Sequence, residues 1–314
     1  MAKPPLDRHR FQRWMLGTLA CGAAVCGVLT GVPRLLSRTP EQSQQVSAAE
    51  PAPVQINLTS AQRARVDPIL LPLQRGELEK GLRASVNDAQ GLVLWLLRAD
   101  EQGQNDEGMR VMQDLRRQHP NAPQVLAAYL FELDIEIQGN HRERSVYKPW
   151  TPEQKQDFHQ TLAQLYKSAP TLWLPYAIEG YRHFYLSGNT PDATQNRGIS
   201  LLQKAVGYGP NVSLIHYRLA SVCNLAADWQ KRPALFATSI TECQKALRLP
   251  PPSTQAAFFA LMCYNYGWIP GQKPDKAKAA MAAKRFLAML PPGFEFNSVL
   301  RENLAMANVP VPTA

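Results

Sequence analysis

The sequence has no block of five or six like charges, although its formal net charge is +9. Charged residues make up only 19% of the 314 positions, and acidic and basic groups are intermixed. Proteins that bind nucleic acid usually concentrate Lys and Arg on one face to neutralise phosphates. The composition therefore argues against a nucleic-acid-binding protein. Two small basic clusters are interpreted as solvated helix or loop faces, namely Arg142/Arg144 and Lys273/Lys276/Lys278/Lys284/Arg285.

Cysteines and catalytic motifs are also scarce. Five cysteines are too few for a chain of this length to be a small fold held by disulfides. The chain has none of the usual metalloprotease, serine-hydrolase, phosphate-loop or Cys-x-x-Cys motifs. We therefore predict a protein that is not an enzyme and that holds no cofactor and no metal. Because 45% of the residues are apolar, wholesale disorder is excluded as well.

One long uncharged run lies near the N-terminus. Residues 15–32 are 18 consecutive uncharged positions, which as a helix nearly span a hydrocarbon core of about 30 Å. Four Lys and Arg residues precede the run and two follow it soon after, a bias that favours a cytoplasmic N-terminus. We predict a short basic cytoplasmic tail over 1–13, a single-pass transmembrane anchor over 14–33, and a membrane protein whose repeat domain is extracytoplasmic (periplasmic in a bacterium). The alternative is a cleaved signal peptide and a secreted soluble repeat protein.

The segment after the run has the composition of a linker. Residues 34–60 are rich in Gln, Ser, Ala and Pro and have few large apolar side chains. Such a segment cannot bury enough surface to offset the entropy of ordering. We predict a flexible linker over 34–60 and a helical repeat domain over 61–314.

The remaining chain has the periodicity of helices. Apolar residues recur three or four positions apart, as over Phe236–Leu247, and no strand alternation is convincing. Thr151–Gln154 has the pattern of a helix start with a capping box. Residues 190–192 and 273–275, both with the sequence X-Pro-Asp, predict further helix starts, and Glu295–Met306 predicts a terminal helix. These signals predict an all-α protein.

Prolines recur at a nearly constant spacing. The intervals are 50, 40, 40 and 41 residues between Pro120, Pro170, Pro210, Pro250 and Pro291. A fixed period in this range is typical of a solenoid of helix pairs. A shift of 40 residues aligns Ala220 with Ala260, and Gly180 takes the same position one period earlier. Small residues there would let paired helices cross closely.

These features resemble the tetratricopeptide repeat, a helix pair with Leu-Gly/Ala in the first helix, small residues in the second and a closing proline. Two pairs carry the pattern, with Leu219, Ala220, Ala246 and Pro251 in one and Gly180, Gly198, Ala205 and Pro210 in the one before it. The period is about six residues longer than in the family. The resemblance covers about residues 86–306 and implies an α-α superhelix, a TPR-like solenoid of about five helix pairs behind one N-terminal transmembrane helix.

The resemblance also implies a binding surface. In the family, the first helix of each pair lines a concave face, where side chains follow the small position by one, four or five residues or precede it by three. Counted from Gly180, Ala220 and Ala260, these include Tyr181, Tyr185, Tyr217, Asn224, Tyr264 and Asn265. Tyrosines and amides suit peptide capture, whereas the family's basic clamp for C-terminal carboxylates is absent there. The alternative is that these residues fill gaps between neighbouring pairs.

The predicted function is that of a membrane-anchored, non-catalytic scaffold or adaptor that binds a protein or peptide partner in the cell envelope through the concave face. One alternative is an accessory subunit or envelope enzyme with a site near Glu179, His183 and His216. A second is a stack that mainly self-associates.

Three cysteines follow one another at intervals of twenty residues, Cys223, Cys243 and Cys263. All three lie on predicted core faces, and cysteine behaves as a small buried hydrophobe. We interpret them as core residues, with one disulfide in an oxidising compartment as the alternative.

Overall fold

A computed structural model describes residues 66–139, 151–186, 193–229, 232, 234–251, 253–267, 273–291 and 293–312. Every regular element in these ranges is helical, with twelve α-helices, one short 3-10 helix and no strand. The all-α fold class predicted from the sequence is therefore confirmed.

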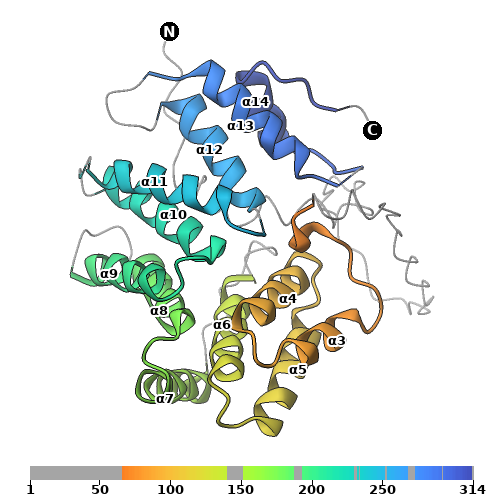
Figure 1. Ribbon diagram of the computed structural model, residues 1–314, viewed down its shortest axis with the longest axis vertical. Helices are drawn as coiled ribbons and strands as arrows, with labels where there is room; N and C mark the ends of the chain where they lie inside the picture. Colours follow the sequence, from red (N-terminus) through yellow and green to blue (C-terminus); the bar gives the residue numbers. More distant parts are fainter. Residues whose placement is uncertain are drawn as a thin grey trace, which may run out of the picture.

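The elements follow one another in the order shown in Figure 1. Their bounds are η2 Pro68–Leu70, α3 Glu77–Ala84, α4 Ala89–Glu101, α5 Asn105–Gln118, α6 Pro123–Gly139, α7 Pro152–Ser168, α8 Trp173–Leu186, α9 Ala193–Tyr208, α10 Ser213–Trp229, α11 Ala234–Arg248, α12 Thr254–Tyr266, α13 Lys276–Ala288 and α14 Ser298–Met306.

One helix starts with the predicted capping box, and two other helices start a few residues after their predicted positions. The Thr151 hydroxyl accepts from the backbone N–H of Gln154 at 3.2 Å, and the Gln154 side chain accepts from the Thr151 N–H at 3.0 Å. This capping box begins α7. α13 begins at Lys276, just after the predicted start over residues 273–275, because the Asp275 side chain caps it by accepting from the Lys278 N–H at 3.0 Å. The terminal helix begins at Ser298 rather than at residue 295, because the Asn297 side chain caps it, and the predicted start at residues 190–192 lies outside the described residues.

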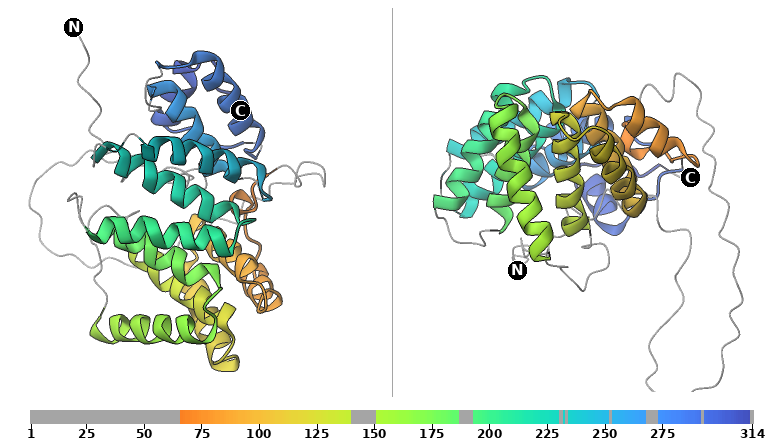
Figure 2. Two further views of the ribbon diagram at one scale, coloured as in Figure 1. Left: turned by 60° about the vertical axis from the view of Figure 1, so that its left-hand side comes forward. Right: turned by 90° about the horizontal axis from the view of Figure 1, so that it is seen from below.

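From α8 onward, consecutive helices pack in pairs. α8 packs along α9, α10 along α11 and α12 along α13, and the pairs follow one another along the longest axis of the molecule (Figures 1 and 2). The first helices α8, α10 and α12 are neighbours, and each of α9 and α11 also contacts the first helix of the next pair. At the other end, α6 contacts α8, α7, α5 and α4.

The turns that precede α6, α8 and α10 are closed by equivalent hydrogen bonds. In each turn the N–H of the residue before the proline donates to a carbonyl four residues back at 2.8 Å. The N–H of the residue two positions after the proline then donates to the carbonyl of the residue just before the proline, at 3.0 or 3.1 Å. The three prolines are Pro120, Pro170 and Pro210. Their spacing therefore corresponds to a repeated structural turn.

The small residues of the repeat lie where paired helices cross, as predicted. A Cβ added to Gly180 of α8 would lie 2.8 Å from the carbonyl oxygen of Gly198 of α9, and one added to Gly198 would lie 2.7 Å from that of Gly180. In the next pair, the Ser239 hydroxyl of α11 donates to the carbonyl of Ala220 of α10 at 2.7 Å. Because the backbones approach this closely, larger side chains at these positions would wedge the helices apart.

The predicted N-terminal segments cannot be compared with the structure. The tail over 1–13, the anchor over 14–33 and the linker over 34–60 all lie outside the described residues. Among the helices that are described, none is both long enough and apolar enough to cross a bilayer.

Candidate functional site

Four of the six residues predicted to bind a ligand are packed between helices. Only 5–8% of each residue is exposed for Tyr181, Tyr217, Asn224 and Asn265. The Arg218 guanidinium lies 4.6 Å from the ring centre of Tyr181, and the Tyr217 ring meets Phe259 edge-on at 6.4 Å. Asn265 donates from Nδ2 to the backbone carbonyl of Asn303 at 2.9 Å. In this conformation these side chains offer little surface to a ligand.

The other two predicted residues differ from these four. Tyr264 of α12 is half-buried, and its ring centre lies 5.9 Å from the Nζ of Lys278. The side chain of Tyr185 lies outside the part of the chain that the structure describes.

The structure brings Glu179 and His183 together and places His216 elsewhere. The Glu179 carboxylate lies 3.1 Å from the His183 Nε2 and accepts from Arg197 of α9 at 3.1 Å, and it also accepts from the Tyr166 hydroxyl of α7. His216 of α10 instead faces the Glu242 carboxylate of α11 and the carbonyl of Pro210, the latter at 2.9 Å.

The contact between His216 and its turn has a counterpart one repeat earlier. The Tyr176 hydroxyl donates to the carbonyl of Pro170 at 2.7 Å, and His216 follows Pro210 by the same six residues. His216 thus joins its helix to the preceding turn, as Tyr176 does. The other ring nitrogen of His216 is hydrogen-bonded to the Glu242 carboxylate.

Sequence reasoning missed a buried charge cluster between α6, α8 and α10. Asp134 of α6 is 2% exposed and lies 3.5 Å from the Arg182 guanidinium of α8. Burial raises the pKa of Asp134 to about 6, against the opposing positive charges of Arg218 and Arg182. The signal in the sequence is that three acidic residues stand among the apolar residues of one helix, of which Asp134 is one.

The described residues include three buried cysteines, and their His, Cys, Asp and Glu side chains are the groups that could ligate a metal ion. In those ranges, no group of three His, Cys, Asp or Glu side chains is placed to hold a metal ion. Cys223, Cys243 and Cys263 are free and buried, in agreement with their interpretation as core residues. Burial raises the pKa of Cys223 and of Cys243 to about 12, which keeps both thiols protonated and unreactive.

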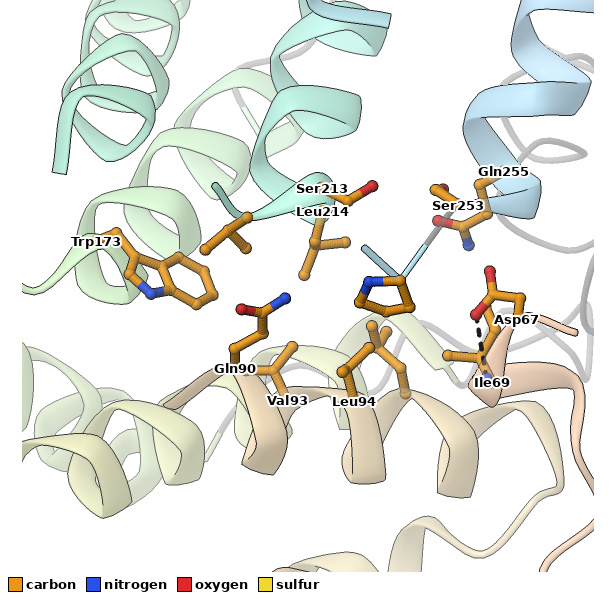
Figure 3. A pocket seen from close by; sticks show the side chains of 13 residues that line it. Asp67, Ile69, Gln90, Val93, Leu94, Trp173, Ser213, Leu214, Ser253 and Gln255 are labelled. Atoms are coloured by element: carbon orange, nitrogen blue, oxygen red, sulfur yellow. Dashed lines mark hydrogen bonds between the residues drawn. The ribbon is translucent and has the colours of Figure 1, made fainter. Parts of the chain in front are cut away.

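Helix α4, together with η2 before it, crosses the starts of α8, α10 and α12. Figure 3 shows the side chains on either side of this crossing: Gln90, Val93 and Leu94 from α4, Trp173 from α8, Leu214 from α10, and Ser253 and Gln255 at the start of α12. Asp67 accepts from the backbone N–H and the hydroxyl of Thr254 at 3.0 and 3.1 Å, so it binds the start of α12 across 187 residues of sequence. The cavity at the crossing is about 40 Å³, which admits a few water molecules but no organic ligand.

A larger groove lies between α11 and α13, with α12 as its floor. Its volume is about 240 Å³. Its apolar lining includes Ile240, Leu247, Ala260, Tyr264, Met281 and Ala282. Met281 is 71% exposed, and burial raises the pKa of the Tyr264 hydroxyl, which keeps that hydroxyl neutral at physiological pH.

Among the described residues that line this groove, every charged one is basic. Arg248 ends α11, while Lys278 and Arg285 lie on α13. Arg285 donates to the backbone carbonyl of Leu247, so it reaches from α13 to α11. Lys278 has a carboxylate neighbour, since its Nζ lies 3.3 Å from Asp275. The groove therefore combines an apolar floor with a positive rim.

Sequence reasoning found Tyr264 from its place in the repeat and noted Lys278 and Arg285 as members of a basic cluster. It missed the groove, because the groove depends on how far apart α11 and α13 lie. Comparisons with protein-family models, with curated proteins and with solved structures found no match to this chain.

Proposed function

We propose that the protein is a membrane-anchored, non-catalytic interaction scaffold whose helix pairs form a TPR-like solenoid. The groove between α11 and α13 binds a segment of another protein in the cell envelope. This groove, with its apolar floor, its basic rim and its volume of about 240 Å³, is the observation that carries the proposal.

The repeated geometry supports the solenoid. The turns at Pro120, Pro170 and Pro210 have the same pattern of hydrogen bonds. The close crossing at Gly180 recurs 40 residues later at Ala220. In such a stack each pair buries the apolar side of its neighbour, and an extended surface remains free for binding.

The size of the groove favours a protein segment over a small-molecule substrate. Pockets for small molecules and cofactors have volumes of about 300–1,000 Å³, and this groove is smaller. Exposed Met281 suits a protein partner, because methionine adapts its shape to varied apolar surfaces. The groove takes precedence over the predicted concave face, because Tyr181, Tyr217 and Asn224 are buried.

The enzyme alternative has less support. A site that uses His216 together with Glu179 and His183 would require the His216 ring to leave both Glu242 and Pro210. Membrane attachment rests on the uncharged run over residues 15–32 and on the basic residues that precede it.

Photocrosslinking from Met281 in intact cells tests the proposed function. The full-length chain would carry p-benzoylphenylalanine at position 281, which is 71% exposed. We expect one discrete adduct with another protein. The matched control places the same group at Tyr208, which is 42% exposed on α9, and this position should not give that adduct. Only self-adducts, or the same adduct from both positions, would contradict the proposal.

A further inference from the structure

The basic side chains stand at the two ends of the groove. Lys278 and Arg285 are seven residues apart on α13, which is two helical turns and about 10 Å along the axis. Because Arg285 bonds to the Leu247 carbonyl, the last turn of α11 lies beside the Arg285 end of α13. Arg248, one residue after Leu247, therefore adds a second positive charge at that end.

Two of these charges lack an acidic partner in the described part of the chain. There Lys278 pairs with Asp275, whereas no ion pair involves Arg248 or Arg285. A guanidinium presents a planar fork of donors that fits a carboxylate. This end of the groove therefore favours a carboxylate ligand.

We propose that the groove binds an amphipathic helix of another protein, with an apolar stripe flanked by acidic residues two turns apart. This inference rests on the proposed function and names the partner's chemistry. Acidic residues at positions i and i+7 of such a helix match the separation of Lys278 and Arg285. Apolar residues at i+3 and i+4 fall between them and face the floor of Ala260 and Tyr264.

The shape of the groove favours a helix over an extended strand. Its walls are the helices α11 and α13 and its floor is the helix α12, so a bound helix extends packing of the same kind. Recognition of an extended peptide by strand addition needs an exposed sheet edge, and the described residues contain no strand.

Three matched peptides test the charge of the partner. Each is a labelled helical peptide with Leu at i+3 and i+4, and positions i and i+7 are both Glu, both Gln or both Lys. Binding to the full-length chain in detergent is measured by fluorescence anisotropy at low and high salt. We expect the Glu peptide to bind most tightly and to lose its advantage at high salt. Each exposed ion pair should contribute about 1.4-fold to 5-fold in affinity.

A charge exchange sharpens the test. The double variant Lys278→Glu, Arg248→Glu should prefer the Lys peptide over the Glu peptide, because both exposed rim positions then repel carboxylates. The matched control is Lys284→Glu, which makes the same kind of change at an exposed position of α13 outside the groove lining. This control should keep the order of the wild type.

Blocking the groove separates this inference from the proposed function. Ala282→Trp fills the groove with a large side chain. Met281→Asp places a carboxylate in the groove at a position that stays exposed in the unbound protein. Both variants should abolish binding of the Glu peptide. Ala288→Trp, at an exposed position outside the lining, should not.

The outcomes distinguish the two ideas. If the Glu and Gln peptides bind equally and both groove variants abolish binding, the groove is a docking site and the acidic chemistry is wrong. If no peptide binds while the Met281 adduct forms, the helical partner is wrong and the proposed function stands. If neither groove variant affects binding or the adduct, both proposals fail.

Discussion

The pair α8/α9 and the pair α6/α7 occupy equivalent places in the repeat but pack differently. α8 and α9 cross at Gly180 and Gly198, where backbone meets backbone. The equivalent positions in the preceding pair, 50 and 40 residues earlier, are Leu130 and Phe158, both buried. α6 packs against α7 far less extensively than α8 packs against α9. The side chains at the crossing therefore determine how closely the two helices of a pair approach.

A polar network joins α6 and α7, the more widely spaced pair, to each other and to α5. Arg116 of α5 donates two hydrogen bonds to the Asp157 carboxylate of α7, each at 2.6 Å. The Tyr129 hydroxyl of α6 donates to the same carboxylate at 2.9 Å, and the Arg116 guanidinium lies 4.4 Å from the Tyr129 ring centre. Asp157 thus connects three helices where backbone contact is not available.

The largest effect is expected for Gly198→Phe. This substitution gives the closely packed pair α8/α9 the phenylalanine that stands at the equivalent position, Phe158, in the more widely spaced pair α6/α7. A Cβ at position 198 already lies 2.7 Å from the Gly180 carbonyl and 3.0 Å from the backbone nitrogen of Phe184, so the helices must separate. Overpacking typically costs about 1–3 kcal/mol and sometimes more, and here backbone atoms cannot yield. We expect the variant not to reach the native fold, as measured by thermal unfolding and limited proteolysis.

Gly207→Ala is the control for this substitution. A Cβ at Gly207 of α9 meets no atom within 4 Å, and alanine is more favourable than glycine inside a helix by about 0.5–1 kcal/mol. The melting temperature should rise slightly. A Gly198→Phe variant that melts like wild type would mean that α8 and α9 do not cross at this position.

Phe158→Ala makes the opposite exchange in the wide pair. Phe158 is 1% exposed, and truncation leaves a cavity because α6 and α7 cannot close over it. We expect a loss of about 3–5 kcal/mol in the free energy of unfolding, measured by urea denaturation. His159→Ala, at the exposed neighbouring position, should change it by less than about 0.5 kcal/mol. Equal effects of the two substitutions would contradict the role assigned to Phe158.

Asp157→Asn tests the polar network, with a smaller effect because the Asp157 side chain is 31% exposed. Hydrogen bonds to charged groups contribute about 1.5–3 kcal/mol when buried, and partial exposure reduces this to about 1–2 kcal/mol. The Arg116 guanidinium lowers the pKa of Asp157. Its stabilisation is therefore complete above the ordinary aspartate pKa of about 4 and is lost as the pH falls below it.

The pH dependence provides the measurement for this prediction. The difference in unfolding free energy between wild type and Asp157→Asn should be constant from neutral pH down to about pH 5 and should shrink in more acidic solution. The control Glu302→Gln alters an exposed carboxylate on α14 and should show no such difference. A difference that grows on acidification would contradict the network.

The parts of the fold that depend on local chemistry were predictable from the sequence. The capping box at Thr151 and the repeated turns at Pro120, Pro170 and Pro210 act within a few residues, and the structure contains each of them. Gly180 and Gly198 were also predictable, because small residues repeated at one period indicate close crossings.

Interactions between distant helices were not predictable in this way. Arg116 and Asp157 are 41 residues apart, and their contact depends on how α5, α6 and α7 pack together. The groove is similar, since Ile240 and Leu247 read as core positions and Lys278 and Arg285 as a solvated face. Only the separation of α11 and α13 turns these residues into one site. The positions of Tyr181 and Tyr217 along their helices left open whether they face a ligand or fill gaps between neighbouring pairs, and in the structure both are buried.

Ser239→Ala carries the smallest expected effect. It tests the crossing of α10 and α11, where a serine stands in place of the glycine of the α8/α9 crossing. Ser239 occupies in α11 the place that Gly198 has in α9, and its hydroxyl donates to the Ala220 carbonyl at 2.7 Å. Alanine stands at the equivalent position 279 of the next pair, where it is fully buried. Removing the hydroxyl should therefore cost only the hydrogen bond, about 0.5–1.5 kcal/mol, in urea denaturation. Ser239→Val adds volume against the backbone of α10 and should cost more stability than Ser239→Ala, because the close approach of the two helices limits the size of this side chain. A larger loss for Ser239→Ala than for Ser239→Val would mean that the hydrogen bond of the hydroxyl, rather than the small size of the side chain, holds α10 and α11 together.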